Sequence, residues 1–217
     1  MRRGLFMLSS LLFLLCSCEK EESERYPSVI TDYACMLTDA SGQPGHLRLD
    51  NGREYPIALT DTYREAHPQL PSYRADTLYR IVGIYELGND DVANIYSIAQ
   101  TVSGIPTPLY SGETMRNDPV YLQSSWLSGG YLNMVLELKA LDGQHSIGFV
   151  DTTPKGMQGK EFTLYHDSHN DVESYRQKLY ASIPLAPFKR DLQQGNILRI
   201  VINLYDKGVS QWEFVME

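Results

Sequence analysis

Residues 131–138, YLNMVLEL, decide the fold class because apolar and polar side chains alternate along them. Every even position is leucine or methionine, whereas Asn133 and Glu137 occupy odd positions. Side chains of a β-strand point to opposite faces in turn, so this period of two predicts a half-buried strand. The same alternation recurs in LRIVINL at residues 198–204 and in QWEFVM at residues 211–216.

Turn signals separate further strands in this half of the chain. Asp142-Gly143 and Asp206-Lys207-Gly208 each favour a tight turn between strands. Additional strands are expected at residues 145–150 and 161–165. About seven short strands are expected in this half as a whole, which predicts a sandwich over residues 119–217. Asn170 and Glu173 have capping-box spacing, so residues 171–185 are expected to form one helical turn and then a strand from about Gln177 that ends near Pro187.

The first half of the chain predicts a small barrel. Asn51-Gly52 is a strong hairpin signal because both residues tolerate positive φ. Five strands are expected, at residues 29–37, 46–50, 53–59, 78–86 and 93–101, with a loop or short helical turn at 63–72. Five strands in this length suit an OB-like barrel over residues 28–104.

Residues 105–118, rich in proline and glycine, are expected to form the linker between the two domains. The predicted fold class is therefore all-β: an N-terminal OB-like five-stranded barrel followed by a C-terminal immunoglobulin-like β-sandwich.

The N-terminus has the pattern of a bacterial lipoprotein signal. A basic start at residues 1–3 precedes an apolar run at residues 4–15 that is too short for a permanent membrane span. Leu15, Ser17 and Cys18 look like a lipobox, so we expect a signal peptide at residues 1–17 and lipidation of Cys18. The alternative is a plain secretory signal with a chance cysteine nearby.

Behind Cys18, residues 18–27 are expected to form a lipidated tether. Its acidic run at residues 19–24 should stay solvated. A lysine followed by acidic residues at this place also resembles an export signal to the outer face of the outer membrane. We therefore expect a protein attached to the outer membrane through the lipid on Cys18 and facing the cell exterior; a periplasm-facing position is the alternative.

Charge and cysteine content exclude some classes of function. The chain carries a net charge of −8, and loss of Arg2 and Arg3 with the signal takes it to −10. Nucleic-acid binding needs lysine and arginine for phosphate contacts, so no nucleic-acid partner is expected. With Cys18 lipidated, Cys35 is left without a disulfide partner and is expected to be a buried, inert thiol.

Two places could bind a ligand. HDSHND at residues 166–171 is the most polar cluster, but its spacing matches no metal motif, so no metal or other cofactor is expected. His166 and His169 remain candidates for binding; a loop whose side chains satisfy the turn backbone is the plainer interpretation. Trp126 and Tyr131 lie on either side of Ser128-Gly129-Gly130 and could form a binding platform. The alternative is that Trp126 packs in the core and a turn follows it.

The tyrosines of the predicted barrel could also offer stacking surfaces, although tyrosine in strands mostly packs within sheets. They are Tyr55, Tyr79, Tyr85 and Tyr96.

Catalytic motifs are not apparent in the sequence. It contains no Gly-x-Ser-x-Gly and no phosphate loop, and its five histidines show no recognisable pairing with a nucleophile. We assign no catalytic residue and expect no enzyme. A carboxylate pair for glycoside cleavage stays open, because such pairs meet only in three dimensions.

Several short stretches, in this order and spacing, resemble the NigD-like lipoproteins. They are LRLDNG at 47–52, DPV at 118–120, SWLSGGYLN at 125–133, HSI at 145–147, LYHD at 164–167 and YASI at 180–183. The resemblance covers the whole mature chain and implies an OB domain followed by a β-sandwich. It implies no catalytic residues, because no molecular activity is established for the family as a whole.

The sequence thus predicts a non-catalytic, lipid-anchored module that binds a glycan or protein ligand at the outer membrane. One alternative, by analogy with the bacteriocin gene neighbourhood that named the family, is an immunity or self-protection protein. A surface hydrolase is the third interpretation.

Overall fold

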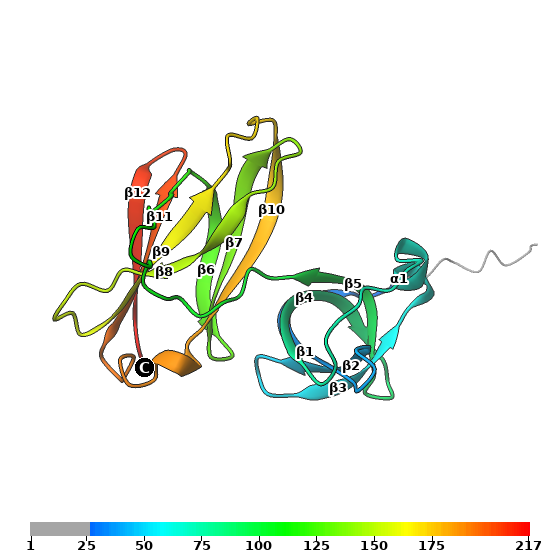
Figure 1. Ribbon diagram of the computed structural model, residues 1–217. Coiled ribbons are helices and arrows are strands. Elements are labelled where there is room, and N and C mark those ends of the chain that lie inside the picture. Colours follow the sequence, from blue (N-terminus) through cyan, green and yellow to red (C-terminus); the bar gives the residue numbers. More distant parts are fainter. Residues whose placement is uncertain (1–26) are drawn as a thin grey trace, which may run out of the picture.

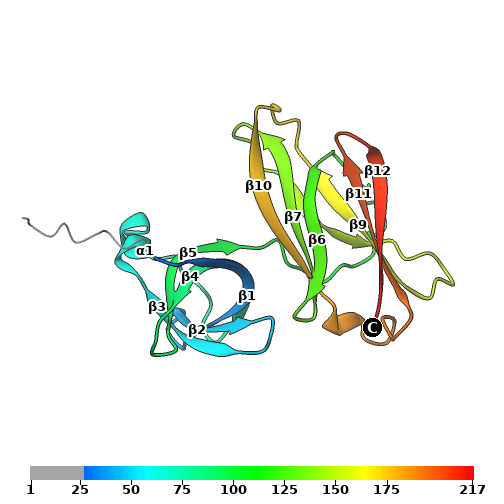
Figure 2. The same cartoon turned by 180° about the vertical axis from the view of Figure 1, so that it is seen from behind.

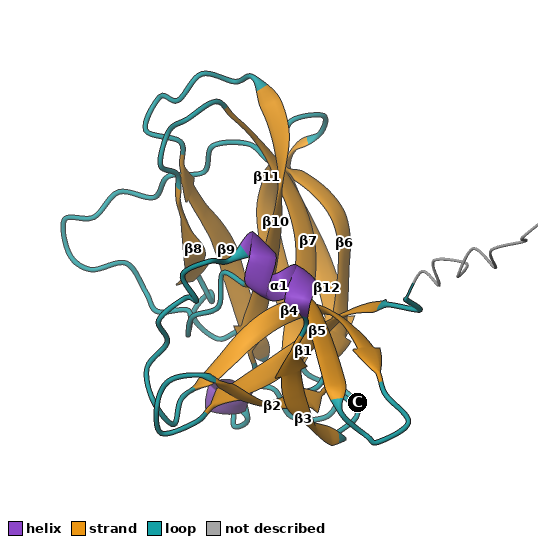
Figure 3. Cartoon of the chain, turned by 90° about the vertical axis from the view of Figure 1, so that its right-hand side faces the viewer, coloured by secondary structure: helices purple, strands orange, loops and turns teal. Residues whose placement is uncertain are grey.

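The computed structural model describes residues 27–217 and divides them into a barrel and a sandwich (Figure 1). The expected signal peptide, the lipidation site Cys18 and nearly all of the tether lie outside the described residues. Within the described part, no helix has the length and hydrophobicity needed to cross a membrane. The predicted all-β class is confirmed, and Figure 3 shows how little helix accompanies the strands.

The N-terminal unit is a closed five-stranded barrel, as the sequence predicts. Its strands follow the order β1-β2-β3-β5-β4 around the barrel, and β3 and β5 close it as a parallel pair. The strands are β1 (Ile30–Thr38), β2 (Pro44–Leu49), β3 (Glu54–Leu59), β4 (Leu78–Leu87) and β5 (Ala93–Gln100).

One short helix, α1 (Asp61–Ala66), follows β3 and contributes to the barrel core. Thr60 caps it, because its side-chain oxygen accepts a hydrogen bond from the backbone N–H of Tyr63 at 3.2 Å. Tyr63 is buried in the apolar core of the barrel and stacks on His67. The helix therefore lies where the sequence predicts a loop or a short helical turn.

The C-terminal unit is a sandwich of two sheets, seen from the opposite side in Figure 2. The three-stranded sheet has the order β10-β7-β6 and the four-stranded sheet the order β12-β11-β9-β8. The strands are β6 (Tyr121–Ser128), β7 (Tyr131–Ala140), β8 (Ser146–Asp151), β9 (Gly159–Asp167), β10 (Tyr175–Pro184), β11 (Ile197–Leu204) and β12 (Gly208–Val215).

The inward rows of β7 and β11 form the centre of the sandwich core, as their alternation predicts. The predicted β-sandwich is confirmed, but one strand pair departs from an all-antiparallel immunoglobulin pattern, because β9 and β11 run parallel. Gly159 permits this pairing. Its φ is +127°, and a Cβ there would overlap the carbonyl oxygen of Ile197.

The helical turn expected after Asn170 is wrong. Asn170 has a φ of +60° and belongs to a turn, whereas a helix N-cap needs an extended backbone. Glu173 instead pairs with Lys139 of β7 at 2.9 Å, and β10 begins at Tyr175. A 3-10 helix that the sequence did not indicate, η1 (Ala186–Phe188), follows β10.

The segment between β5 and β6, which contains the expected linker, is fastened along the sandwich. Isolated bridges join Val102 to Ala181 of β10 and Thr107 to Val150 of β8. Further along, Asn117 forms a bridge with His166 of β9. The expected linker is therefore fastened to the sandwich at Thr107 and Asn117, and we call residues 107–117 the crossing segment.

The barrel and the sandwich meet at a buried arginine, Arg80 of β4, whose side chain is 2% exposed. Its guanidinium donates two parallel hydrogen bonds to the carboxylate of Asp50, at 2.5 and 2.9 Å. It also donates to Ser182 at 3.0 Å and to Asn133 at 2.9 Å, both in the sandwich. The guanidinium carbon lies 4.1 Å from the ring centroid of Tyr131. The Arg80 side chain, which belongs to the barrel, therefore donates hydrogen bonds to residues of both units.

Aromatic contacts surround this arginine. The hydroxyl of Tyr33 on β1 donates to the carbonyl oxygen of Met134 on β7 at 2.5 Å. The ring of Tyr33 meets Trp126 edge-on at 5.2 Å. Gly129 lies against Asp50 so closely that a Cβ would overlap the carboxylate. Polar and aromatic groups together therefore fix where the sandwich sits on the barrel.

Replacing Arg80 with methionine should lower the free energy of unfolding by about 3 kcal/mol, because Asp50, Asn133 and Ser182 lose their shared donor in a buried place. Urea denaturation measures the change. Arg53→Met, at an exposed arginine after the β2–β3 turn, is the matched control and should change stability by less than about 0.5 kcal/mol. Equal losses in the two variants would contradict the role given to Arg80.

Candidate functional site

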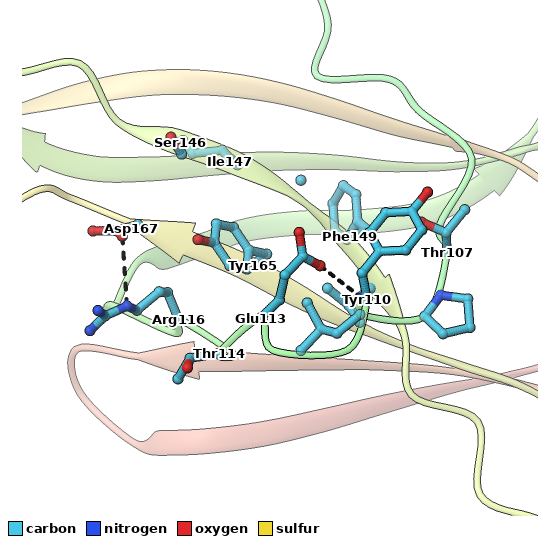
Figure 4. A pocket seen from close by; sticks show the side chains of 14 residues that line it. Thr107, Tyr110, Glu113, Thr114, Arg116, Ser146, Ile147, Phe149, Tyr165 and Asp167 are labelled. Carbon is cyan, nitrogen blue, oxygen red and sulfur yellow. Dashed lines mark hydrogen bonds and ion pairs between the residues drawn. The ribbon is translucent and has the colours of Figure 1, made fainter.

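An open groove of about 620 Å³ lies between the crossing segment and strands β8 and β9 (Figure 4). Its size is that of pockets that bind small molecules. Aromatic rings and charged side chains line it together. The lining includes Tyr110, Glu113, Arg116, Gly148, Tyr165 and Asp167.

The crossing segment forms the wall of the groove and is held at both ends. At one end the backbone N–H of Asp151 on β8 donates to the carbonyl of Thr107 at 3.1 Å. At the other, the N–H of His166 on β9 donates to the carbonyl of Arg116 at 3.0 Å. The crossing segment therefore passes from the edge of β8 to β9 and cannot shift without breaking these bonds.

Between its fastened ends the wall makes a tight turn. The N–H of Glu113 donates to the carbonyl of Tyr110 at 3.0 Å, and the N–H of Tyr110 donates to the carboxylate of Glu113 at 2.8 Å. Gly112 supplies the φ of +94° that this turn requires. The turn holds the Tyr110 ring out, with 73% of the residue exposed.

The register of β8 and β9 forms the floor. Tyr165 lies opposite Gly148, and Asp167 lies opposite Ser146. Paired residues share a face, and this face is opposite to the one that buries Leu164 in the core. Because Gly148 has no side chain, and a Cβ there would meet no atom within 4 Å, space stays open beside the Tyr165 ring.

One positive and one negative side chain of the groove form an ion pair. Arg116 Nε lies 3.7 Å from a carboxylate oxygen of Asp167, and Arg116 is the more exposed of the two. Figure 4 shows Glu113 between this pair and the Tyr110 ring. The site therefore offers flat apolar rings together with hydrogen-bonding groups, a combination that suits a ligand with apolar faces and hydroxyl edges.

Behind the groove runs a chain of buried hydrogen bonds. His166, 1% exposed, places Nδ1 2.9 Å from the carbonyl oxygen of Asp118 and Nε2 2.8 Å from Nδ1 of His145. Nε2 of His145 lies 3.2 Å from a carboxylate oxygen of Asp171. The chain thus joins the end of the crossing segment to the β9–β10 turn.

The depth of burial of His166 decides its protonation state in this chain. We assign the neutral imidazole to His166, the more deeply buried of the two rings. Burial lowers the pKa of His166, and the nearby His145 lowers it further, which agrees with this assignment.

The two aspartates at the ends of this hydrogen-bonded chain, Asp118 and Asp171, have carboxylates that are held in the ionised form. The backbone N–H of Leu141 donates to Asp171 and lowers the pKa of Asp171 to about 2. The hydroxyl and N–H of Ser168 donate to Asp118 and lower the pKa of Asp118. The β9–β10 turn is therefore tied to the wall of the groove.

The structure separates the four residues that the sequence proposes for binding. His166 is buried in the hydrogen-bonded chain, whereas His169 lies in the exposed β9–β10 turn with a φ of +50° and contacts Ser146 at 2.9 Å. Trp126 and Tyr131 lie instead at the junction with the barrel. Within residues 27–217, no group of three or more histidine, cysteine or acidic side chains is arranged to hold a metal.

The barrel tyrosines do not form a common stacking surface. Tyr55 and Tyr85 are buried in the barrel core. Tyr79 packs edge-on against Tyr73, and the Tyr96 hydroxyl donates to Glu86 at 3.4 Å. Cys35 is buried, as expected.

Sequence reasoning missed the residues of the groove wall. Tyr110, Glu113 and Arg116 lie in a segment that proline and glycine marked as a linker. An aromatic residue two positions before Gly112 was the available signal, since glycine-containing loops often present binding residues. His145 was also missed, because its contact with His166 depends on the β8–β9 register.

A closed five-stranded barrel joined to a seven-stranded sandwich defines a two-domain β-protein. A family model described as the NigD-like C-terminal beta sandwich domain matches residues 106–216. The chain belongs to the NigD-like family, which confirms the resemblance seen in its sequence.

Solved structures show the same arrangement. A NigD-like immunity protein from Bacteroides caccae is 26% identical and has a TM-score of 0.67; the match covers 88% of this chain and 99% of that one. A protein of unknown function from Bacteroides vulgatus is 17% identical, with a TM-score of 0.62 and coverage of 88% and 92%, and shares the fold. No curated protein matches the chain.

Stability should fall as the pH drops from 7 to 5, in part because of His166. Its pKa is lowered in the folded protein, so below the ordinary value of 6.5 the unfolded chain binds more protons than the folded one. Acidification therefore favours unfolding until the pH passes the folded-state pKa.

Urea denaturation across this pH range should give a shallower dependence for His166→Gln than for the unchanged protein. His46→Gln, at an exposed histidine of β2, should keep the original dependence. Identical slopes in all three proteins would refute the neutral state assigned to buried His166.

Proposed function

We propose that this chain is a lipid-anchored, non-catalytic binding protein that faces the exterior of the outer membrane and holds a glycan in the groove beside β8. The observation that carries the proposal is the groove itself: an exposed tyrosine on a wall fastened at both ends, above a floor with a second tyrosine and charged groups. Such a site is preformed, so binding costs little ordering of the protein.

A glycan suits the chemistry of this groove. The Tyr110 and Tyr165 rings provide apolar faces against which the C–H face of a sugar can pack. Glu113, Asp167 and Arg116 provide acceptors and donors for its hydroxyls. The fixed wall and the absent side chain at Gly148 leave room for a ring between them.

The assignment as non-catalytic rests on how the nearby histidines are used. Both ring nitrogens of His166 are engaged, one with a backbone carbonyl and one with His145. His145 is likewise engaged at both nitrogens. These rings support the wall of the groove rather than face a substrate.

An immunity or self-protection protein is the second candidate. It is favoured by the relative from Bacteroides caccae, which is described as a NigD-like immunity protein. Deleting the gene and exposing the cells to toxins of sister strains tests this candidate. Increased sensitivity that the intact gene reverses would support it, and unchanged sensitivity would remove it.

Glycan binding should depend on the two groove tyrosines. A glycan array run with the purified protein should give a ligand, and calorimetry with Tyr110→Ala or Tyr165→Ala should show binding weakened about tenfold, which corresponds to about 1.4 kcal/mol per ring. Tyr175→Ala, at an exposed tyrosine of β10 outside the groove, is the matched control. Equal weakening in the control, or no glycan ligand at all, would overturn the proposal.

The anchor should depend on Cys18. Metabolic labelling with palmitate should mark the unchanged protein and fail to mark Cys18→Ala, while Cys16→Ala should still be labelled. Protease added to intact cells should remove the protein if it faces outward. Unlabelled protein in the first experiment, or full protection in the second, would reject the lipid anchor or the outward orientation respectively.

A further inference from the structure

A second cavity, about 490 Å³ in volume, lies where the barrel meets the sandwich, and we call it the junction pocket. The turn after β2, the turn between β6 and β7, and the segment from Pro184 to Leu192 all contribute to its lining. Pockets of this volume hold small organic ligands. It is distinct from the groove beside β8, with which it shares no lining residue.

Glycines keep the junction pocket open. Gly52 and Gly130 have φ values of +85° and +81°, which side chains rarely adopt, and a Cβ at either position would meet no atom within 4 Å. The carbonyl of Gly130 accepts a hydrogen bond from the N–H of Leu185 at 2.9 Å. Two walls of the pocket are therefore joined directly by a backbone bond.

Much of the lining is apolar. Leu185 and Leu192 are 8% and 9% exposed and continue into the sandwich core. Tyr131 and Met216 are half-buried beside them. Burial raises the pKa of Tyr131 to about 12, so its phenol stays neutral. A hydrocarbon body would find apolar contacts here.

The charged groups of the pocket are unbalanced in favour of cations. Asp50 is neutralised by its two hydrogen bonds with Arg80. Lys189 has no carboxylate within 4.0 Å in the described part of the chain, and Arg48 has only Glu54 at 3.8 Å, with both side chains about half exposed. Two cations at an apolar pocket stand out in a chain whose net charge is −8.

We propose that the junction pocket binds an organic anion with a carboxylate head and an apolar body. The carboxylate lies at Arg48 and Lys189, and the apolar body lies against Tyr131, Leu185 and Met216. Charge complementarity decides the head group, because a cationic or neutral amphiphile would leave Lys189 without a partner. Since barrel and sandwich both line the pocket, such a ligand also binds the two units together.

Calorimetric titration with octanoate tests the proposal on the mature chain, residues 18–217, carrying Cys18→Ser, which removes the lipid and the need for detergent. Octanoate should bind, whereas 1-octanol and octylammonium, with the same chain and no negative charge, should bind at least about fivefold more weakly. Amide spectra should show the Gly129 and Gly130 signals shifting with octanoate.

Variants assign the binding to this pocket. Lys189→Gln should weaken octanoate binding about fivefold, and Ala186→Trp, which places a large side chain at the pocket wall and keeps both cations, should abolish it. Arg53→Gln, which changes the net charge equally outside the pocket, should bind octanoate normally. Melting curves of each variant show that it is folded.

Three results would overturn the proposal: no octanoate binding up to about 10 mM, equal affinity for 1-octanol, or unchanged binding in both Lys189→Gln and Ala186→Trp. The outcome is independent of the glycan groove. Glycan titrations of the same variants should be unchanged, and failure of glycan binding would leave the octanoate result standing.

Discussion

The buried guanidinium of Arg80 is the interaction on which the arrangement of this molecule depends. A buried charge is costly unless it is paired and hydrogen-bonded, and here Asp50 pairs with it from the barrel while Asn133 and Ser182 accept from the sandwich. The pair can stay buried only while both units are in contact. Tyr131 covers the guanidinium and forms part of the junction pocket, so the same contact that joins the units also builds a cavity between them.

The groove beside β8 depends on a second constraint, the path of the crossing segment. It is held by a few backbone bonds at its two ends, and the buried pair His145 and His166 connects one of those ends to Asp171. The Tyr110 side chain is therefore held by elements that are far apart in sequence. Both cavities have walls fixed by buried polar contacts and floors of apolar or aromatic groups, which is the usual composition of ligand sites.

Local sequence patterns predicted most of the strands, whereas the groove and the histidine chain depend on tertiary contacts. Asn51-Gly52 and the alternation in β7 indicate hairpin and strand because they depend on neighbouring residues alone. β6 was not recognised as a separate strand, since Ser124 and Ser125 interrupt its apolar pattern. The groove and the histidine chain could not be predicted, because they require the register of β8 on β9 and the path of the crossing segment.

Arg80 holds the barrel and the sandwich as one body. Residual dipolar couplings measured on amides of both units test this role of Arg80 most directly. A single alignment tensor should fit the barrel strands and the sandwich strands of the unchanged protein, and Arg80→Met should need two. If the unchanged protein already requires two separate tensors, the units move independently, and neither a fixed junction nor a preformed junction pocket exists.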